Sequence, residues 1–217
     1  YKKVKKNLNV SQLLWSEVPK RDGIFAKACN APGYTCDRLR IAIVNCRNCG
    51  FCHTGCKFDR KQSLILNYIP EAEKNGAKIK EECKALLVKR NEKGYLVAYK
   101  DLKSGVINEV SCKAVIVSAG AIQSPALMLR SKKYLDNLSS HVGKNLTANG
   151  NIFLAAHLPN EDCEVFKGKV QGSVTYAFWE EGFVLQGVGT LPISATVINR
   201  VRFNNANRPF YWGIEMK

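Results

Sequence analysis

The sequence contains no apolar stretch long enough to cross a membrane. Its longest apolar run, residues 114–122, is far shorter than the ~20 residues that a membrane-spanning helix needs. Internal repeats and low-complexity tracts are absent as well, so nothing indicates a repeat architecture. With 217 residues, 46% of them apolar, the chain has enough material for one large or two small globular domains.

Acidic residues are scarce, because 18 Asp and Glu stand against 33 Lys and Arg and leave a net charge of +15. Such an excess of positive charge is typical of proteins that bind nucleic acids or anionic membranes. The cations are scattered along the chain, however, and do not form one stripe with interleaved aromatic residues. We therefore predict no nucleic-acid partner. The basic residues are expected to form a solvated surface, or a surface that meets acidic partner chains or an anionic substrate.

Cysteine, by contrast, is concentrated in one place. Cys46, Cys49, Cys52 and Cys56 lie at spacings of three, three and four residues. Thiolates at these spacings can converge on one soft-metal centre, and bacterial ferredoxins use the same spacing to bind a cubane iron-sulfur cluster. Zinc sites usually need two CxxC pairs separated by a longer loop. The spacing therefore predicts these four cysteines as the ligands of an iron-sulfur cluster.

Two features depart from the ferredoxin pattern. Lys57 occupies the position at which those ferredoxins have proline, and no second motif provides another cluster for Cys56 to ligate. Zinc, unligated thiols and disulfide bonds are therefore alternatives for the quartet. The nine cysteines are odd in number and poorly placed for a disulfide-stapled secreted protein, which favours a reducing, cytoplasmic compartment. We predict that the other five are buried and inert: Cys29, Cys36, Cys83, Cys112 and Cys163.

The hydrophobic pattern predicts an α/β fold. Helices are expected at 23–31 and 63–75, and again at 126–131 after a tight turn of small residues. Within 63–75, Pro70 marks either the first turn of a separate helix or a kink. Period-two runs separated by Asn-Glu-Lys-Gly and Lys-Ser-Gly predict an antiparallel meander. The run Ala114–Ser118 is continuously apolar, as in a strand buried on both faces of a parallel sheet. The expected strands are 77–80, 85–90, 95–99, 106–110, 114–118, 152–157, 172–178, 183–188, 194–203 and 210–215.

The order of several motifs resembles the middle of a glucose-methanol-choline (GMC) oxidoreductase, a family of FAD flavoproteins. These motifs are, along the chain, CxxCGxCxxGC, Tyr68–Ala72, Gly76–Ala77, the meander, Val115–Ser131 and Val142–Leu146. Each is weakly specific alone, whereas their order and spacing together are specific. The cysteine-rich loop is similar to that of a subset that includes sugar and gluconate dehydrogenases with a cluster near the flavin, and also to that of plant-type long-chain alcohol oxidases.

The resemblance implies which residues contact FAD. In family members the residue that opens the first meander strand touches the adenine side of FAD through its backbone, and Ala85 holds this position here. The turn of Ala119, Gly120 and Ala121 matches the family's AGA, in which absent side chains let the backbone approach the cofactor closely. Ser124 matches the serine of the same motif. Without the resemblance, this turn would be interpreted as a simple connection between a strand and a helix.

The chain departs from the family in the segments that carry catalysis. The GxGxxG segment that holds the pyrophosphate is absent, although the sequence contains 16 glycines. The segment with the catalytic histidine is absent too, because His53, His141 and His157 do not match its motif. We therefore interpret the chain as the central portion of an enzyme, with no catalytic residue of its own. Its expected partners are the missing N- and C-terminal portions or partner subunits of that enzyme.

The resemblance also implies a division of the α/β chain. Residues 1–60 are expected to form a connecting segment with the cysteine-rich loop, and residues 61–148 part of a Rossmann-like FAD-binding domain with the antiparallel meander. Residues 149–217 are expected to be part of a mixed-sheet substrate domain. The complete enzyme would oxidise a CH–OH group of an alcohol or sugar, with electrons relayed through the iron-sulfur cluster to an acceptor. The alternatives are a non-catalytic iron-sulfur or zinc subunit and, less favoured, a nucleic-acid-binding protein with a zinc knuckle.

Overall fold

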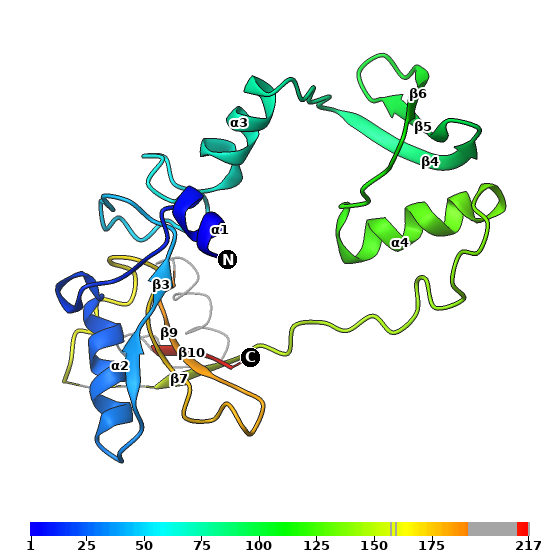
Figure 1. Cartoon of the computed structure of the whole chain (residues 1–217). Coiled ribbons are helices and arrows are strands. Elements are labelled where there is room, and N and C mark those ends of the chain that lie inside the picture. The colour runs from blue at the N-terminus through cyan, green and yellow to red at the C-terminus, as the bar shows by residue number, and fades with distance from the viewer. Residues whose placement is uncertain (157, 159, 191–211, 217) are drawn as a thin grey trace. The chain divides into compact units, whose positions relative to one another are not determined.

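The computed structural model describes residues 1–156, 158, 160–190 and 212–216, in which the chain folds into two compact units (Figure 1). The first unit consists of residues 1–76 together with 149–217, and the second of residues 77–148. Both units contain helices and antiparallel sheet, so the fold is mixed α/β. Among the described residues, no helix combines the length and apolar character that crossing a bilayer requires.

A five-stranded sheet forms the centre of the first unit. Its strands follow the order β2-β8-β9-β10-β7, and every neighbouring pair is antiparallel. The strands that the sequence predicts near 152, 172, 183 and 210 are thereby confirmed, whereas the one at 194–203 lies outside the described residues. The bounds are β2 Cys36–Arg38, β7 Ile152–Ala156, β8 Gln171–Thr175, β9 Leu185–Val188 and β10 Trp212–Met216.

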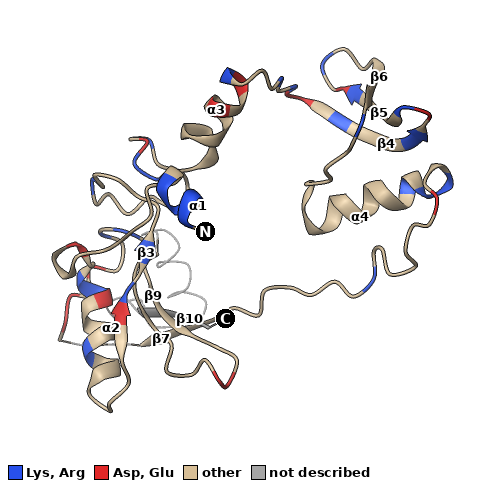
Figure 2. Ribbon diagram, viewed as in Figure 1, with Lys and Arg blue, Asp and Glu red and all other residues tan. Residues whose placement is uncertain are grey.

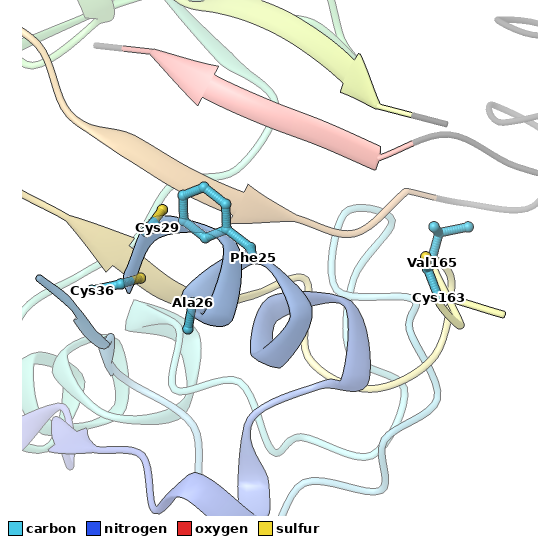
Figure 3. Packing of buried hydrophobic residues seen from close by; sticks show 6 residues of the cluster. All are labelled: Phe25, Ala26, Cys29, Cys36, Cys163 and Val165. Atoms are coloured by element: carbon cyan, nitrogen blue, oxygen red, sulfur yellow. The ribbon is translucent and has the colours of Figure 1, made fainter. Parts of the chain in front are cut away.

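Helix α2 (Lys20–Asn30) packs against this sheet and confirms the helix predicted at 23–31. Its apolar side contributes Phe25, Ala26 and Cys29 to a buried cluster that also includes Cys36, Cys163 and Val165 (Figure 3). Because these side chains come from a helix, a strand and a distant loop, the cluster ties together segments that are far apart in the sequence.

The remaining elements of the first unit are short. They are α1 Lys2–Asn7, β1 Ser11–Gln12, η1 Trp15–Glu17, β3 Arg40–Ile41, η2 Leu64–Leu66 and α3 Tyr68–Lys74. The helix predicted at 63–75 is interrupted, because Asn67 leaves helical geometry at φ −140° and ψ −76°, and Pro70 lies in the first turn of the separate helix α3, one of the two outcomes that were expected for it. The Asn67 side chain instead accepts a hydrogen bond of 2.8 Å from the backbone N–H of Tyr68 and caps α3. Lys and Arg are spread over α1, α2, β3 and the second unit, as Figure 2 shows.

The second unit is the predicted antiparallel meander with one helix packed on it. Strands β4 (Cys83–Asn91), β5 (Gly94–Asp101) and β6 (Ile107–Cys112) pair in that order. The C-terminal end of helix α4 (Gly120–Ser131) contacts β4. The short helix η3 (Lys132–Tyr134) follows α4 in the chain. There the buried hydroxyl of Ser131 accepts a hydrogen bond of 2.8 Å from the N–H of Val88 and donates one of 2.7 Å to the carbonyl of Leu127.

Two strand predictions in this unit are wrong. Residues 77–80 and 114–118 belong to no strand, and Ile116 is 90% exposed. A strand needs a neighbour for its backbone hydrogen bonds, and no strand of the described residues pairs with either segment. The helix predicted at 126–131 also begins earlier, at Gly120, so the small-residue turn is itself the first turn of α4.

Candidate functional site

The predicted small-residue turn lies at the start of α4. Gly120 has φ of +83°, in the left-handed region that favours glycine, and a Cβ placed there would meet no atom within 4 Å. Ala119, Gly120 and Ala121 are exposed, and Ser124 is half-buried. No side chain caps the helix. The first N–H groups of α4 therefore lie beside open space, where they can bind an anionic group.

The other predicted cofactor residue, Ala85, is half-buried in β4 and pairs with Tyr99 of β5. The pairing register shifts between Ala85 and Leu87, and the carbonyl of the intervening Leu86 accepts a hydrogen bond of 3.1 Å from Arg130 Nε. Arg130 belongs to the last turn of α4. The two predicted cofactor segments thus lie in one unit, on elements that are joined at the C-terminal end of α4.

The four clustered cysteines line one cavity. Cys46, Cys49, Cys52 and Cys56 all contribute to its walls, which are otherwise apolar and basic. Cys49 is exposed and the other three thiols are half-buried. The four residues therefore share one local site.

Residues 166–168 hold the cysteine loop in place. The N–H of Gly168 donates a hydrogen bond of 3.0 Å to the carbonyl of Asn48, and Cys49 forms an isolated parallel bridge with Gly168. Gly50 is buried at φ +77°, and a Cβ on it would collide with the carbonyl of Phe166. Glycine is required at this position because the two backbones approach so closely.

Backbone N–H groups point at three of the four sulfurs. Asn48 donates to Cys46 Sγ at 3.3 Å. Arg60 donates to Cys56 Sγ, also at 3.3 Å. A backbone N–H of Val170 reaches the sulfur of Cys52. Such donors stabilise thiolates and are found around metal-bound sulfur.

The electrostatic surroundings of these thiols differ. Backbone N–H groups, that of Lys61 foremost, hold the pKa of the Cys56 thiol below its usual range. Burial raises the pKa of Cys52, and the neighbouring cysteines add to this effect. The thiolate form is therefore favoured at Cys56 and disfavoured at Cys52.

The convergence that a cluster needs is not present. In the part of the chain that the structure describes, no group of three or more His, Cys, Asp or Glu side chains is arranged to hold a metal ion. The geometry therefore does not support the predicted iron-sulfur cluster, and all nine cysteines are free thiols. Among the other five, the prediction of burial is confirmed for Cys29, Cys36 and Cys163 and wrong for the half-buried Cys83 and Cys112.

The three histidines are separated in the sequence, at positions 53, 141 and 157. His53 Nε2 is 3.3 Å from the carbonyl oxygen of Gly189, which gives this ring a structural contact. His141 is exposed in the second unit. His157 lies outside the described residues.

Sequence analysis missed a buried ion pair at the start of α2. Arg21 and Asp22 have side chains that are 1% and 0% exposed, and Arg21 Nη2 lies 3.2 Å from Asp22 Oδ2. The guanidinium also donates hydrogen bonds to the carbonyls of Lys167, at 2.5 Å, and Lys169. Adjacent opposite charges are common on helix surfaces, so the sequence carries no signal of this burial.

The chain resembles known proteins over most of its length. The model of the GMC oxidoreductase family matches residues 1–149. A cholesterol oxidase of Acinetobacter baumannii is 33% identical over 143 residues, which are 60% of this chain and 26% of that protein. Uncharacterized GMC-type oxidoreductases of two Mycobacterium tuberculosis strains are 28% identical over 181 residues, 81% of this chain and 28% of their own length. This chain thus spans about a quarter of these relatives, and it belongs to the GMC oxidoreductase family.

Proposed function

We propose that this chain is a portion of an FAD-dependent oxidoreductase that oxidises a CH–OH group of an alcohol or sugar. The observation that carries the proposal is the exposed, uncapped start of α4, which lies within the region matched by the GMC family. The relative named cholesterol oxidase supports an alcohol as the donor, because cholesterol is itself an alcohol.

Two segments of the second unit support the proposal that it binds part of FAD. The backbone at Gly120 is open on the side where a Cβ would project, so a ligand can approach it closely. The N–H groups of the first turn of α4 would bind the pyrophosphate or ribityl oxygens, and the backbone at Ala85 would lie near the adenine. When bound, FAD supplies the acceptor for a hydride.

The proposal gives this chain a binding role and no proton-transfer role. A histidine from the rest of the enzyme would take the hydroxyl proton of the donor. Residues 61–148 would hold part of the cofactor, and residues 149–217 would contribute to the substrate domain. The substrate pocket therefore depends on segments of the protein besides this chain.

A visible spectrum of the full-length protein tests the proposal. We expect flavin absorption, and under anaerobic conditions we expect this absorption to bleach when a suitable alcohol or sugar is added. The matching ketone or aldehyde serves as a control, because it has no hydride to give. A protein without flavin, or a flavin that no member of a broad alcohol and sugar panel reduces, would contradict the proposal.

The N–H donors to three cysteine sulfurs favour a second role for the cysteine loop. We propose that Cys46, Cys49, Cys52 and Cys56 ligate an iron-sulfur cluster, which would supply one-electron transfer toward an acceptor. The sulfurs would have to converge further than they do in this structure. A non-catalytic iron-sulfur or zinc subunit is the alternative, and a protein with metal but no flavin would favour it.

A further inference from the structure

Two buried thiols lie at the corner between α2 and β2. Cys29 and Cys36 are 8% and 6% exposed and belong to the same core cluster (Figure 3). Each thiol also affects the pKa of the other, as expected for neighbouring sulfurs. We propose that this pair is a dithiol–disulfide site, which covalently closes the corner between α2 and β2 when it is oxidised.

The backbone holds the two residues close together. The carbonyl of Cys29 accepts a hydrogen bond of 3.1 Å from the N–H of Tyr34. The N–H of Cys36 donates one of 3.2 Å to Asn30 Oδ1. Gly33, at φ +95°, makes the sharp turn between them. A disulfide needs two closely spaced residues whose sulfurs can meet, and these hydrogen bonds together with the shared core cluster keep Cys29 and Cys36 close to each other.

The oxidant in this proposal is a small disulfide such as glutathione disulfide. The sulfur of Cys29 attacks the disulfide, which forms a mixed disulfide and releases one glutathione thiolate. Cys36 then loses its proton to solvent and attacks the sulfur of Cys29, and the second glutathione leaves. In sum, two protein thiols and one glutathione disulfide give one protein disulfide and two glutathione molecules.

The order of attack follows from the surroundings of the two sulfurs. Burial raises the pKa of the Cys36 thiol to about 12, and the nearby Cys29 raises it further. Burial also raises the pKa of Cys29, but the neighbouring Cys36 opposes this shift, so Cys29 is the better nucleophile. Residues 31–35 between the pair are all exposed, so local opening of the corner would admit the oxidant. Oxidation should therefore be slow in the folded protein and faster in mild urea.

Cys163 provides a matched control in the same cluster. It is 5% exposed, and its thiol contacts the carbonyl of Glu161 at 3.7 Å and not another sulfur. If burial in the core were enough for oxidation, Cys163 would react as the pair does. If contact between two thiols is required, Cys163 should stay reduced.

Peptide mapping of the full-length protein tests the proposal. The protein is equilibrated with glutathione and glutathione disulfide at several low urea concentrations, quenched with acid, denatured and alkylated. Trypsin cuts after Lys27 and Arg38, so one peptide, Ala28–Arg38, contains both cysteines. We expect the mass of this peptide to fall by two hydrogens and its cysteines to resist alkylation. This oxidation should become faster as the urea concentration increases. After treatment with dithiothreitol, both thiols should be alkylated. The peptide 145–167, with Cys163, should be alkylated throughout.

Serine substitutions of the three cysteines test which thiols form the disulfide. Cys29→Ser or Cys36→Ser should abolish the mass loss, whereas Cys163→Ser should leave the yield of disulfide unchanged. If a single variant fails to fold, the map of the unaltered protein decides alone. Alkylation of both thiols at the most oxidising ratio, or linkage of either one to a different cysteine, would overturn the proposal. This inference does not depend on the proposed oxidation of CH–OH donors.

Discussion

Asp22 Oδ1 accepts a hydrogen bond of 2.9 Å from the backbone N–H of Gly172, and this bond joins α2 to β8 across most of the chain. The same oxygen also accepts from the N–H of Ser173, at 3.2 Å. A side chain at Gly172 would not fit, because its Cβ would lie 2.6 Å from Pro19 Cδ and 3.1 Å from the carboxylate carbon of Asp22. The contact thus depends on a buried charge, on its partner Arg21, and on glycine in the facing strand.

We expect Asp22→Ala to destabilise the first unit by about 3–5 kcal/mol, because it leaves the buried Arg21 charge and two N–H groups without their acceptor. Urea denaturation of the full-length protein measures the change. Asp37→Ala is the control, since the ion pair of Asp37 with Arg38 is largely exposed and such pairs contribute about 1 kcal/mol or less. Equal effects of the two substitutions would contradict this account.

The stability should depend on pH through Asp22. Burial raises the pKa of this carboxyl from 3.8 to about 6, although Arg21 and the N–H donors oppose the shift. Between pH 4 and 6 the folded state therefore binds more protons than the unfolded state, so the contribution of Asp22 falls as the pH rises through this window. Over this window, the contribution of Asp22 to the free energy of unfolding should fall by on the order of 3 kcal/mol.

The measurement compares the unaltered protein with Asp22→Asn, in which residue 22 does not titrate. The free energy of unfolding of the unaltered protein, minus that of the variant, should decrease from pH 4 to pH 6 and then level off. A difference that is constant or that increases over this range would show that the carboxylate is not destabilised by burial.

The sequence predicted the elements whose signals are local. The meander followed from period-two runs and from turns such as Asn91–Gly94, whose flanking residues pair as expected. The apolar run Ala114–Ser118 was misassigned, because a strand depends on partners elsewhere in the protein and not on its own composition.

In the candidate sites too, the sequence predicted only what depends on local spacing. The short spacing of the four clustered cysteines limits how far their thiols can separate, and they line one cavity. The spacing could not predict whether the sulfurs converge, since that depends on the contacts of the loop with residues 166–168. The role of Asp22 was equally hidden, because its backbone partners lie 150 residues away.

A glycine substitution tests how tightly Arg21 is enclosed. A Cβ at Gly189 would lie 2.5 Å from Arg21 Cζ, so Gly189→Ala should destabilise the protein by about 1–3 kcal/mol through overpacking. At Gly23, in the middle of α2, a Cβ would meet no atom within 4 Å, and Gly23→Ala should stabilise the helix by up to about 1 kcal/mol. The melting temperatures of the two variants and of the unaltered protein, measured in one buffer, compare the two substitutions. Destabilisation by both would indicate that backbone flexibility, and not crowding, is responsible.

The proposed cluster predicts a specific loss in Cys49→Ser. Removing one thiolate from a site that needs four should reduce the iron and sulfide content of the purified full-length protein by about half or more. Cys83→Ser is the control, because Cys83 is a half-buried thiol of the other unit. Unaltered protein that contains no iron, or equal iron in both variants, would remove the cluster from the proposal.

The last prediction concerns FAD. Gly120→Val places a branched side chain where the backbone is proposed to approach the cofactor, so the flavin content of the full-length protein should fall by about tenfold or more. Valine is also strained at φ +83°, and this strain has to be separated from the loss of binding. Gly105→Val is the matched control, because Gly105 lies in the same unit at φ +74° and a Cβ there would contact only the end of the Lys100 side chain, at 4.0 Å. Both variants should lose similar stability, whereas only Gly120→Val should lose flavin. If the two retain equal flavin, the start of α4 does not contact the cofactor.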